Sequence, residues 1–393
     1  MTLSALTVRG PFRGPTGYDH HVREFVRELH RQGVRVHLID LPEWGPVRLP
    51  RHLRDPWFET LGQPVDADVV LHFCMPHQVI LFPNRANVNY TMFEATRIPP
   101  TWVMAGRQHD LVVLPTESSR RAWIASGVPQ NRVRLCPLGI DADLYGTPAE
   151  PWPLQRDSGE SIAEYRVRFL NVSALGPRKN LHGLLRAWLL ATSAQDNAIL
   201  ILKIGRYAPG WLEEFRHEIQ VLQVTLGKRL EQAAPVHFVT DLLSDAEMPR
   251  LYAASSHYIS TSFGEGWDQP MIEAAASGLR LIAPNHSAYP AYLDASVAQL
   301  LASREVPAVF PGGGVIGDLF EDVRWWEPDE AAAIAAIRAA IAGHDADKAS
   351  ARERILRDFT WERATCRLLE LLDDVAVRRR RPERWPGRLW SKR

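Results

Sequence analysis

Short apolar runs alternate with amphipathic stretches along the whole chain. Residues 3–10, LSALTVRG, predict a buried strand that leads into a loop at 11–17 containing Gly and Pro. Apolar spacings of three and four then predict a helix that ends at Gly33, followed by a strand at 34–41, VRVHLIDL. The expected buried face of this helix is His21, Phe25, Val26, Leu29 and His30. Strand, glycine loop, helix and strand in this order are typical of a parallel α/β sheet.

The same alternation continues and then restarts in the second half of the chain. Further strands are expected at 66–73, 87–92, 110–116 and 132–138, and then at 165–175, 198–205, 236–242, 257–262 and 279–284. Helices are expected at 117–126, 180–194, 211–227, 245–254, 270–277 and 361–377. A stretch interrupted by Gly146, Pro148, Pro151 and Pro153 separates the halves. We therefore predict two Rossmann-like, doubly wound domains, residues 1–150 and 160–358, facing each other across a cleft where the strands end.

Size, charge and cysteine content narrow the class of protein. A chain of 393 residues suits two domains, and 46% hydrophobic with 23% charged residues indicates a folded globular protein. The formal net charge of +0 gives no electrostatic reason to expect a nucleic-acid partner. Cys74, Cys136 and Cys366 are widely spaced and odd in number, which favours reduced thiols over a disulfide framework or a zinc site.

The two ends of the chain bear on its location. The first residues lack a signal-peptide pattern, and no apolar run approaches membrane-spanning length, so we expect a cytoplasmic protein. Residues 378–393 form a basic tail that begins with Arg378–Arg381. A solvated chain end is the more common explanation of such a tail. Peripheral contact with an anionic membrane surface is the alternative.

The most informative segment is STSFGEGWDQPMIEAAASG, residues 260–278. A strand is expected to end near Ser262, a turn to carry Gly264 and Gly266, and a helix to begin at Pro270. This places Glu265 on the loop and Glu273 in the first helical turn. Backbone N–H groups at a loop and helix start favour a phosphate, whereas two carboxylates repel it and accept hydrogen bonds from hydroxyls. The segment therefore suits a nucleotide sugar, although a solvent-facing Glu265 and a helix-stabilising Glu273 remain the alternative.

Glu265 to Ala274 resembles the Glu-Gly-aromatic-Gly-x-Pro-x-x-Glu-Ala signature of the retaining nucleotide-sugar glycosyltransferases of family 4, which have the GT-B fold. The departures are Trp267, where the family has Phe, and Asp268, where it has Gly. The resemblance implies that Glu273 holds the donor ribose and Glu265 the transferred sugar. It also implies that Gly266 and Trp267 approach that sugar through their backbone.

A second matching segment, residues 169–181, contains Arg178 and Lys179 just before a predicted helix. A cation is mildly unfavourable at a helix start, so Lys179 is better explained by a diphosphate than by chance. The family places an Arg five residues before this Lys, where this chain has Ala174, and Arg178 or Arg206 is the expected substitute. Residues 14–17, ending at Gly17, resemble the family's glycine loop, and residues 361–377 resemble a helix that packs back on the first domain.

Other residues have ordinary structural explanations as well as functional ones. His72, His77 and Glu94 are candidate acceptor-side groups near the ends of first-domain strands. Each is equally well explained as a polar residue at a cleft or, for Glu94, as a charge at a helix start. The Asp-x-Asp triplets at 66–68 and 141–143 are expected to be structural, and no metal or other cofactor is expected beside the donor.

The resulting hypothesis is transfer of a hexose from a UDP- or GDP-linked donor to a glycan, a lipid-linked or a small-molecule acceptor, with retention and without metal. A phosphorylase, a sugar-nucleotide epimerase and a degenerate nucleotide-sugar-binding protein are the alternatives. The sequence leaves open the acceptor, the donor base and sugar, and the oligomeric state.

Overall fold

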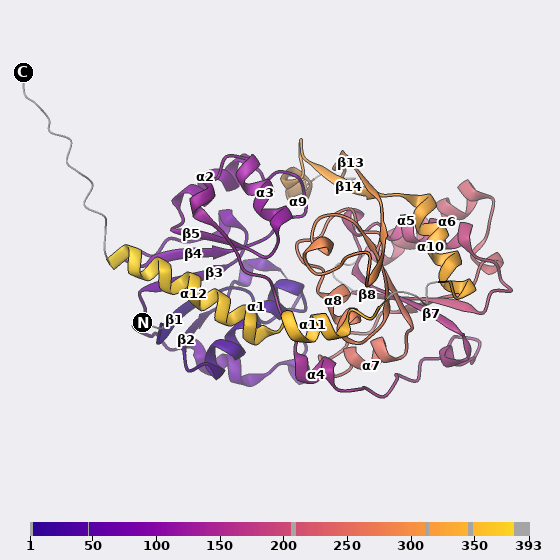
Figure 1. Ribbon diagram of the computed structural model, residues 1–393, viewed down its shortest axis with the longest axis horizontal. Coiled ribbons are helices and arrows are strands. Elements are labelled where there is room, and N and C mark those ends of the chain that lie inside the picture. The colour runs from indigo at the N-terminus through magenta and orange to yellow at the C-terminus, as the bar shows by residue number, and fades with distance from the viewer. Residues whose placement is uncertain (1–2, 46, 206–209, 311–313, 345–348, 381–393) are drawn as a thin grey trace, which may run out of the picture.

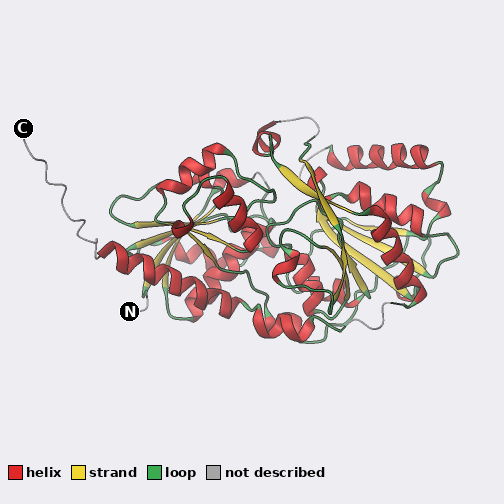
Figure 2. Cartoon of the chain, turned by 45° about the horizontal axis from the view of Figure 1, so that its top comes forward, coloured by secondary structure: helices red, strands yellow, loops and turns green. Residues whose placement is uncertain are grey.

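The computed structural model describes residues 3–45, 47–205, 210–310, 314–344 and 349–380. It has two lobes, each built around a parallel sheet of six strands with helices on its faces (Figures 1 and 2). The α/β fold with two Rossmann-like sheets is therefore confirmed. Arg206 and residues 381–393 of the basic tail lie outside the described residues.

The first lobe has the strand order β2-β1-β3-β4-β5-β6, and all neighbours are parallel. Its strands are β1 (Ala5–Arg9), β2 (Arg35–Ile39), β3 (Val69–Phe73), β4 (Ala86–Tyr90), β5 (Leu111–Leu114) and β6 (Val133–Leu135). Its helices are α1 (Gly17–Arg31), α2 (Pro100–Gln108), α3 (Glu117–Ala125) and α4 (Ala142–Gly146). Helix α1 begins at a capping box, in which the side chains of Thr16 and Asp19 accept each other's backbone N–H groups.

The second lobe has the order β12-β11-β10-β7-β8-β9, again all parallel. Its strands are β7 (Val167–Ala174), β8 (Ala198–Gly205), β9 (Val236–Val239), β10 (His257–Ile259), β11 (Arg280–Pro284) and β12 (Ala298–Leu301). Its helices are α5 (Leu181–Ala191), α6 (Trp211–Leu226), α7 (Met248–Ala253), α8 (Gln269–Ala276) and α10 (Glu330–Ala342). Chain order reverses between β7 and β10, and ligands of doubly wound sheets bind at such a reversal.

Three segments from late in the chain join the two lobes. An antiparallel hairpin, β13 (Ser303–Pro307) and β14 (Arg324–Pro328), encloses α9 (Gly314–Leu319) and was not predicted. Phe320 stacks on Phe93 of the first lobe with ring centroids 4.7 Å apart. Helix α11 (Arg352–Asp358) then leads to α12 (Trp361–Arg380), which runs along the first lobe beside α1 (Figure 1). Because α12 extends to Arg380, Arg378 and Arg379 are helical rather than part of a tail.

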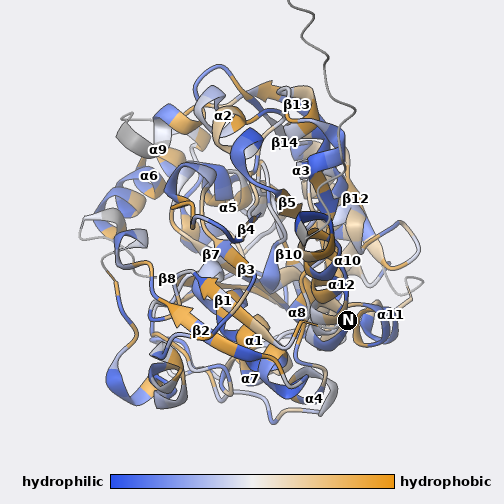
Figure 3. Ribbon diagram, turned by 90° about the vertical axis from the view of Figure 1, so that its left-hand side faces the viewer, coloured by the Kyte–Doolittle hydropathy of each residue, from blue (hydrophilic) through white to orange (hydrophobic). Residues whose placement is uncertain are grey.

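The core is continuous between the lobes. One cluster of buried apolar side chains includes Val8 and Leu71 of the first sheet, Leu170 and Ile199 of the second, and Leu368 of α12. Hydrophobic residues are concentrated on strands such as β1 and β2 (Figure 3). The position of the predicted domain boundary near residue 150 remains a prediction, and it falls between β6 and β7.

Candidate active site

A cavity of about 1090 Å³ lies between the two lobes. Residues that follow β1 form one side of it, including Gly17 at the start of α1. Residues at the ends of β7 and β8 and on the loop after β10 form the other side. The cavity therefore lies at the carboxyl ends of strands from both sheets, where doubly wound folds place their ligands.

Two cations and two carboxylates meet in this cavity. Lys179 Nζ lies 2.7 Å from Glu265 Oε1, and Arg178 Nη1 lies 3.0 Å from Glu265 Oε2. Arg178 also donates to the carbonyl of Gly264 at 2.5 Å and lies 3.6 Å from Glu94. The structure thus brings together four residues that the sequence singled out from three distant segments.

Local backbone geometry places both cations at the end of β7. Residues Pro177–Lys179 form a single 3₁₀ turn, and Asn180 then adopts a left-handed conformation, with φ of 51°. The Asn180 side chain accepts a hydrogen bond from the Gly183 N–H and so caps α5, while its amide donates to the carbonyl of Thr261. This cap ties the turn to the loop that carries Glu265.

The two acids of the Glu265 loop have opposite electrostatic environments. Burial raises the pKa of Glu265, but the charges of Lys179 and Arg178 outweigh it, and the pKa falls to about 2. Burial and the nearby charge of Glu265 raise the pKa of Asp268 to about 7. Asp268 Oδ2 also accepts a 2.9 Å hydrogen bond from Tyr289. One loop therefore presents a fixed anion and a second carboxyl that titrates near neutrality.

Glu273 lies on α8 and lines the same cavity. The helix begins at Gln269, so Pro270 is its second residue and Glu273 its fifth, one residue later than expected. Tyr252 donates a 2.8 Å hydrogen bond to Glu273 Oε2. Burial raises the pKa of Glu273, and this hydrogen bond partly offsets the shift.

The glycines of the loop lie against the first lobe. A Cβ at Gly264 would lie 2.4 Å from the Glu94 carbonyl oxygen, and a Cβ at Gly266 would lie 2.6 Å from Met92 Sδ. The Trp267 indole packs against Tyr292 and Phe359, and its backbone carbonyl accepts a hydrogen bond from Tyr292. Both Gly266 and Trp267 line the cavity. The absence of side chains at both glycines thus permits the lobes to approach each other at this point.

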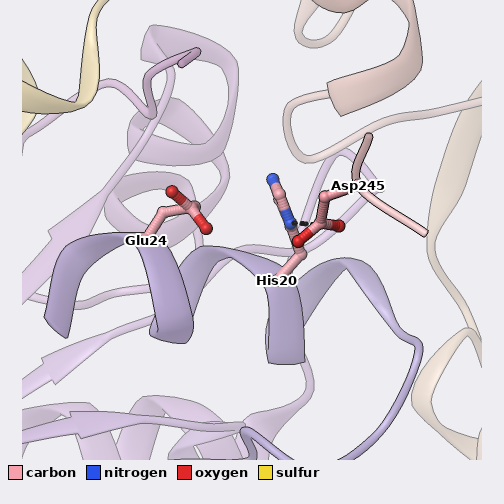
Figure 4. Close-up of side chains that lie close together, drawn as sticks. All are labelled: His20, Glu24 and Asp245. Carbon is pink, nitrogen blue, oxygen red and sulfur yellow. Dashed lines mark ion pairs between the residues drawn. The ribbon is translucent and has the colours of Figure 1, made fainter. Parts of the chain in front are cut away.

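His20, Glu24 and Asp245 gather where the lobes meet (Figure 4). His20 and Glu24 lie one turn apart on α1, and His20 Nδ1 is 4.0 Å from Asp245 Oδ1 on the opposite side of the cavity. Their ligand atoms lie within 4.8 Å of one another, which is close enough for a metal ion. However, Glu24 already forms an ion pair with Arg27, and the charge of Arg23 acts on both Glu24 and Asp245. Arg23 and Arg27 therefore compete with a metal ion for these carboxylates.

His72 and His77 do not line the cavity. His72 is fully buried in β3, where Nε2 lies 3.3 Å from Asn87 Oδ1, and burial lowers its pKa to about 3. His77 accepts a hydrogen bond from the Trp102 indole at 2.8 Å. His72 lies within β3 itself, and His77 lies in a short 3₁₀ turn at Pro76–Gln78. Both have structural contacts instead.

Several residues at or beside the cavity were not singled out from the sequence. Lys203 lines the cavity but was expected only as part of the strand at 198–205. Tyr252 and Tyr289, which hydrogen-bond to the cavity acids Glu273 and Asp268, resemble ordinary core aromatics. His20 precedes His21, which the helical pattern explained as buried. The departure at Asp268 was the one signal available in the sequence.

Comparisons with known proteins agree with this geometry. Residues 166–310 match the family model described as glycosyl transferases group 1. These residues form a group 1 glycosyltransferase domain. The domain includes the Arg178–Lys179 turn and the loop that carries Glu265, together with Glu273.

The relatives found by these comparisons are distant in sequence. The chain is 27% identical over 168 residues to the O-antigen chain mannosyltransferase B of Escherichia coli; the aligned part is 41% of this chain and 39% of that protein. Among solved structures, Anabaena HepE in complex with UDP and glucose has a TM-score of 0.65 and 17% identity, covering 94% of this chain and 100% of the other. Sucrose-phosphate synthase of Thermosynechococcus elongatus has a TM-score of 0.63 and 17% identity, with 95% and 99% coverage. These structures share the two-domain GT-B fold.

Proposed function

We propose that this protein is a retaining glycosyltransferase that moves a hexose from a UDP- or GDP-linked donor to an acceptor without a metal ion. The observation that carries the proposal is the cluster of Arg178, Lys179 and Glu265 at the carboxyl ends of the second sheet. The mannosyltransferase of Escherichia coli and the UDP-bound Anabaena structure support a nucleotide-sugar donor.

The proposed donor position follows from the spacing of charges. Lys179 and Glu265 are in contact, so groups bound by them must be neighbours in the ligand. In a nucleotide sugar, the terminal phosphate is bonded directly to the hexose. We therefore assign Lys179 and Arg178 to the diphosphate and Glu265 to hexose hydroxyls. Glu273, farther along α8, is assigned to the ribose.

Bond cleavage at the sugar carbon leaves a growing negative charge on the diphosphate. Lys179, Arg178 and the backbone N–H groups of the Glu265 loop stabilise that charge in the transition state. With retention, the acceptor attacks from the face that the diphosphate leaves, and a phosphate oxygen takes the acceptor proton. The acceptor enters from the first lobe, whose cavity wall includes Gly17 and Glu94.

Substitution of two residues tests the assignment. Lys179→Ala should lower the turnover of the donor by about 100-fold or more, because charge stabilisation in the transition state is lost. Glu273→Ala should mainly raise KM for the donor, because the ribose contact is equal in ground and transition states. Donor turnover is measured with UDP-glucose and GDP-mannose, and NMR of the product reports its anomeric configuration.

Glu353→Ala, at an exposed position of α11, is the control and should behave as the unmodified protein. Rates like those of the unmodified protein in both site variants would overturn the assignment. Tight donor binding without any product would instead favour a binding protein, and release of sugar that depends on inorganic phosphate would favour a phosphorylase.

Metal independence is tested separately. EDTA should leave turnover unchanged, because Arg178 and Lys179 supply the positive charge and Arg27 already neutralises Glu24. Loss of activity in EDTA that Mn²⁺ or Mg²⁺ restores would contradict this and direct attention to His20, Glu24 and Asp245.

A further inference from the structure

Lys203 is a buried cation at the wall of the cavity. It lies on β8, a strand whose other residues are almost all apolar, and only 7% of it is exposed. Its side chain lines the cavity, and no described residue forms a hydrogen bond or ion pair with its ammonium group. A buried ammonium without a partner is costly, so proteins retain one where a ligand or partner supplies the opposite charge.

The pairing of β7 with β8 shows which way this side chain extends. Val172 pairs with Lys203, and Ala174 pairs with Gly205. Paired residues of parallel strands, and residues two apart on one strand, present their side chains on the same face. Lys203 therefore shares its face with Ala174 and Gly205, which are both small. Their size leaves room for its flexible four-carbon stem in the part of the cavity beside the end of β7.

The two other cations on the second-lobe wall of the cavity, Arg178 and Lys179, are already paired. Glu265 and Glu94 lie beside Arg178 and Lys179, so these four residues together carry no excess positive charge. A nucleoside diphosphate carries at least two negative charges at neutral pH. The charge of Asp241 acts on the pKa of Lys203, but Asp241 is exposed. Among the described residues, it forms no ion pair with Lys203. Lys203 is thus a cation of this wall that no described carboxylate neutralises.

We propose that Lys203 binds the diphosphate of the donor nucleotide and supplies the positive charge that Ala174 does not. This inference rests on the proposed function. Lys203 acts from β8, whereas Arg178 and Lys179 act from the turn after β7, so the diphosphate lies between cations of neighbouring strands. Arg178, one of the two expected substitutes for an Arg at Ala174, is held by Glu265, Glu94 and the carbonyl of Gly264.

Burial is consistent with this role. It lowers the pKa of Lys203, and Asp241 partly opposes the shift. A bound diphosphate would favour the charged form of the amine. Binding and charge on Lys203 are therefore coupled, which is expected of a group that holds an anion.

The test is the affinity of the full chain for nucleotides, measured by calorimetry. UDP, GDP and ADP are compared with uridine, guanosine and adenosine. Lys203→Met removes the charge and keeps the length of the side chain. We expect its Kd for the preferred nucleoside diphosphate to rise about 10- to 100-fold, which corresponds to loss of a charge-assisted hydrogen bond, while its Kd for the nucleoside is unchanged. Lys203→Arg should recover most of the diphosphate affinity.

Lys228→Met is the matched control, because Lys228 lies away from the cavity and donates to the carbonyls of Leu189 and Thr192. It should lower the melting temperature without ligand and leave nucleotide affinity unchanged. Lys203→Met should keep or raise the melting temperature, since it removes a buried charge.

Two outcomes would overturn the inference in different ways. If the unmodified protein binds and turns over a donor but Lys203→Met binds the diphosphate equally well, the role of Lys203 is wrong and the proposed function stands. If the unmodified protein binds none of the three diphosphates, the proposed function falls and the inference with it.

Discussion

Asp268 has a backbone conformation that favours glycine and an environment that disfavours a charged side chain. Its φ is 62°, in the left-handed region where glycine is favoured, and the carboxyl group is buried beside Glu265. The Tyr289 hydroxyl hydrogen-bonds to it, and Ser260 in turn hydrogen-bonds to that hydroxyl at 2.7 Å.

The pKa of Asp268 predicts how stability depends on pH. In the unfolded chain an Asp loses its proton near pH 4, whereas in the folded protein Asp268 keeps its proton up to about pH 7. The folded state therefore binds more protons between these values, and this contribution to stability is lost as pH rises from 4 to 7. Asp268→Asn should remove this loss. Its melting temperature should therefore exceed that of the unmodified protein by a margin that widens from pH 5 to about pH 7 and then levels off. The corresponding difference in the free energy of unfolding is on the order of 2 kcal/mol.

Asp322→Asn is the control for this experiment, because Asp322 has a similar φ of 55° but is exposed. It should follow the pH dependence of the unmodified protein. A constant difference between Asp268→Asn and the unmodified protein over this pH range would show that the carboxyl does not titrate there. Glu265 stays ionised throughout the range and adds no slope.

At the scale of elements, the loop between β10 and α8 belongs to the second lobe and also contacts the first. It carries Glu265 and Asp268 into the cavity, and its glycines touch the chain after β4. The contact at Gly264 is with a backbone carbonyl, which cannot rotate away, whereas the contact at Gly266 is with the flexible Met92 side chain.

Gly264→Ala should therefore lower the free energy of unfolding by about 1 to 3 kcal/mol, because it overpacks the site. Gly266→Ala should lower it by less. Gly62→Ala is the control, because a Cβ there would meet nothing within 4 Å. Urea unfolding measures all three. Equal effects of the two loop substitutions would mean that the lobes separate easily at this point.

At the scale of the whole molecule, α11 connects the lobes through Arg352. Its guanidinium donates to the carbonyls of Tyr145 and Gly146, after the first sheet, and of Ala276 at the end of α8. Among the helices within the described ranges, none is long and apolar enough to cross a membrane. The contacts of α11 and α12 fix the first lobe against the second.

Arg352→Gln should cost about 1 to 3 kcal/mol of stability, because part-buried carbonyls lose their donors. Arg354→Gln on the same helix should cost less than about 1 kcal/mol, since its ion pair with Asp294 is at the surface. Thermal unfolding compares the two. If Arg352→Gln is no more harmful than Arg354→Gln, the lobes are held by the apolar core alone.

The sequence by itself determined the two α/β halves and the segments that carry Arg178, Lys179, Glu265 and Glu273. Strand and helix periods are local properties, and the Glu265 loop combines glycines, a proline and acids within a few residues. The packing of the β13–β14 hairpin, the position of Glu94 at the cavity and the positions of His72 and His77 outside it depend on contacts between distant residues. Only the tertiary structure decided these, and only it placed Lys203 at the cavity wall, because the surroundings of a side chain are set by how strands lie together and not by the order of residues.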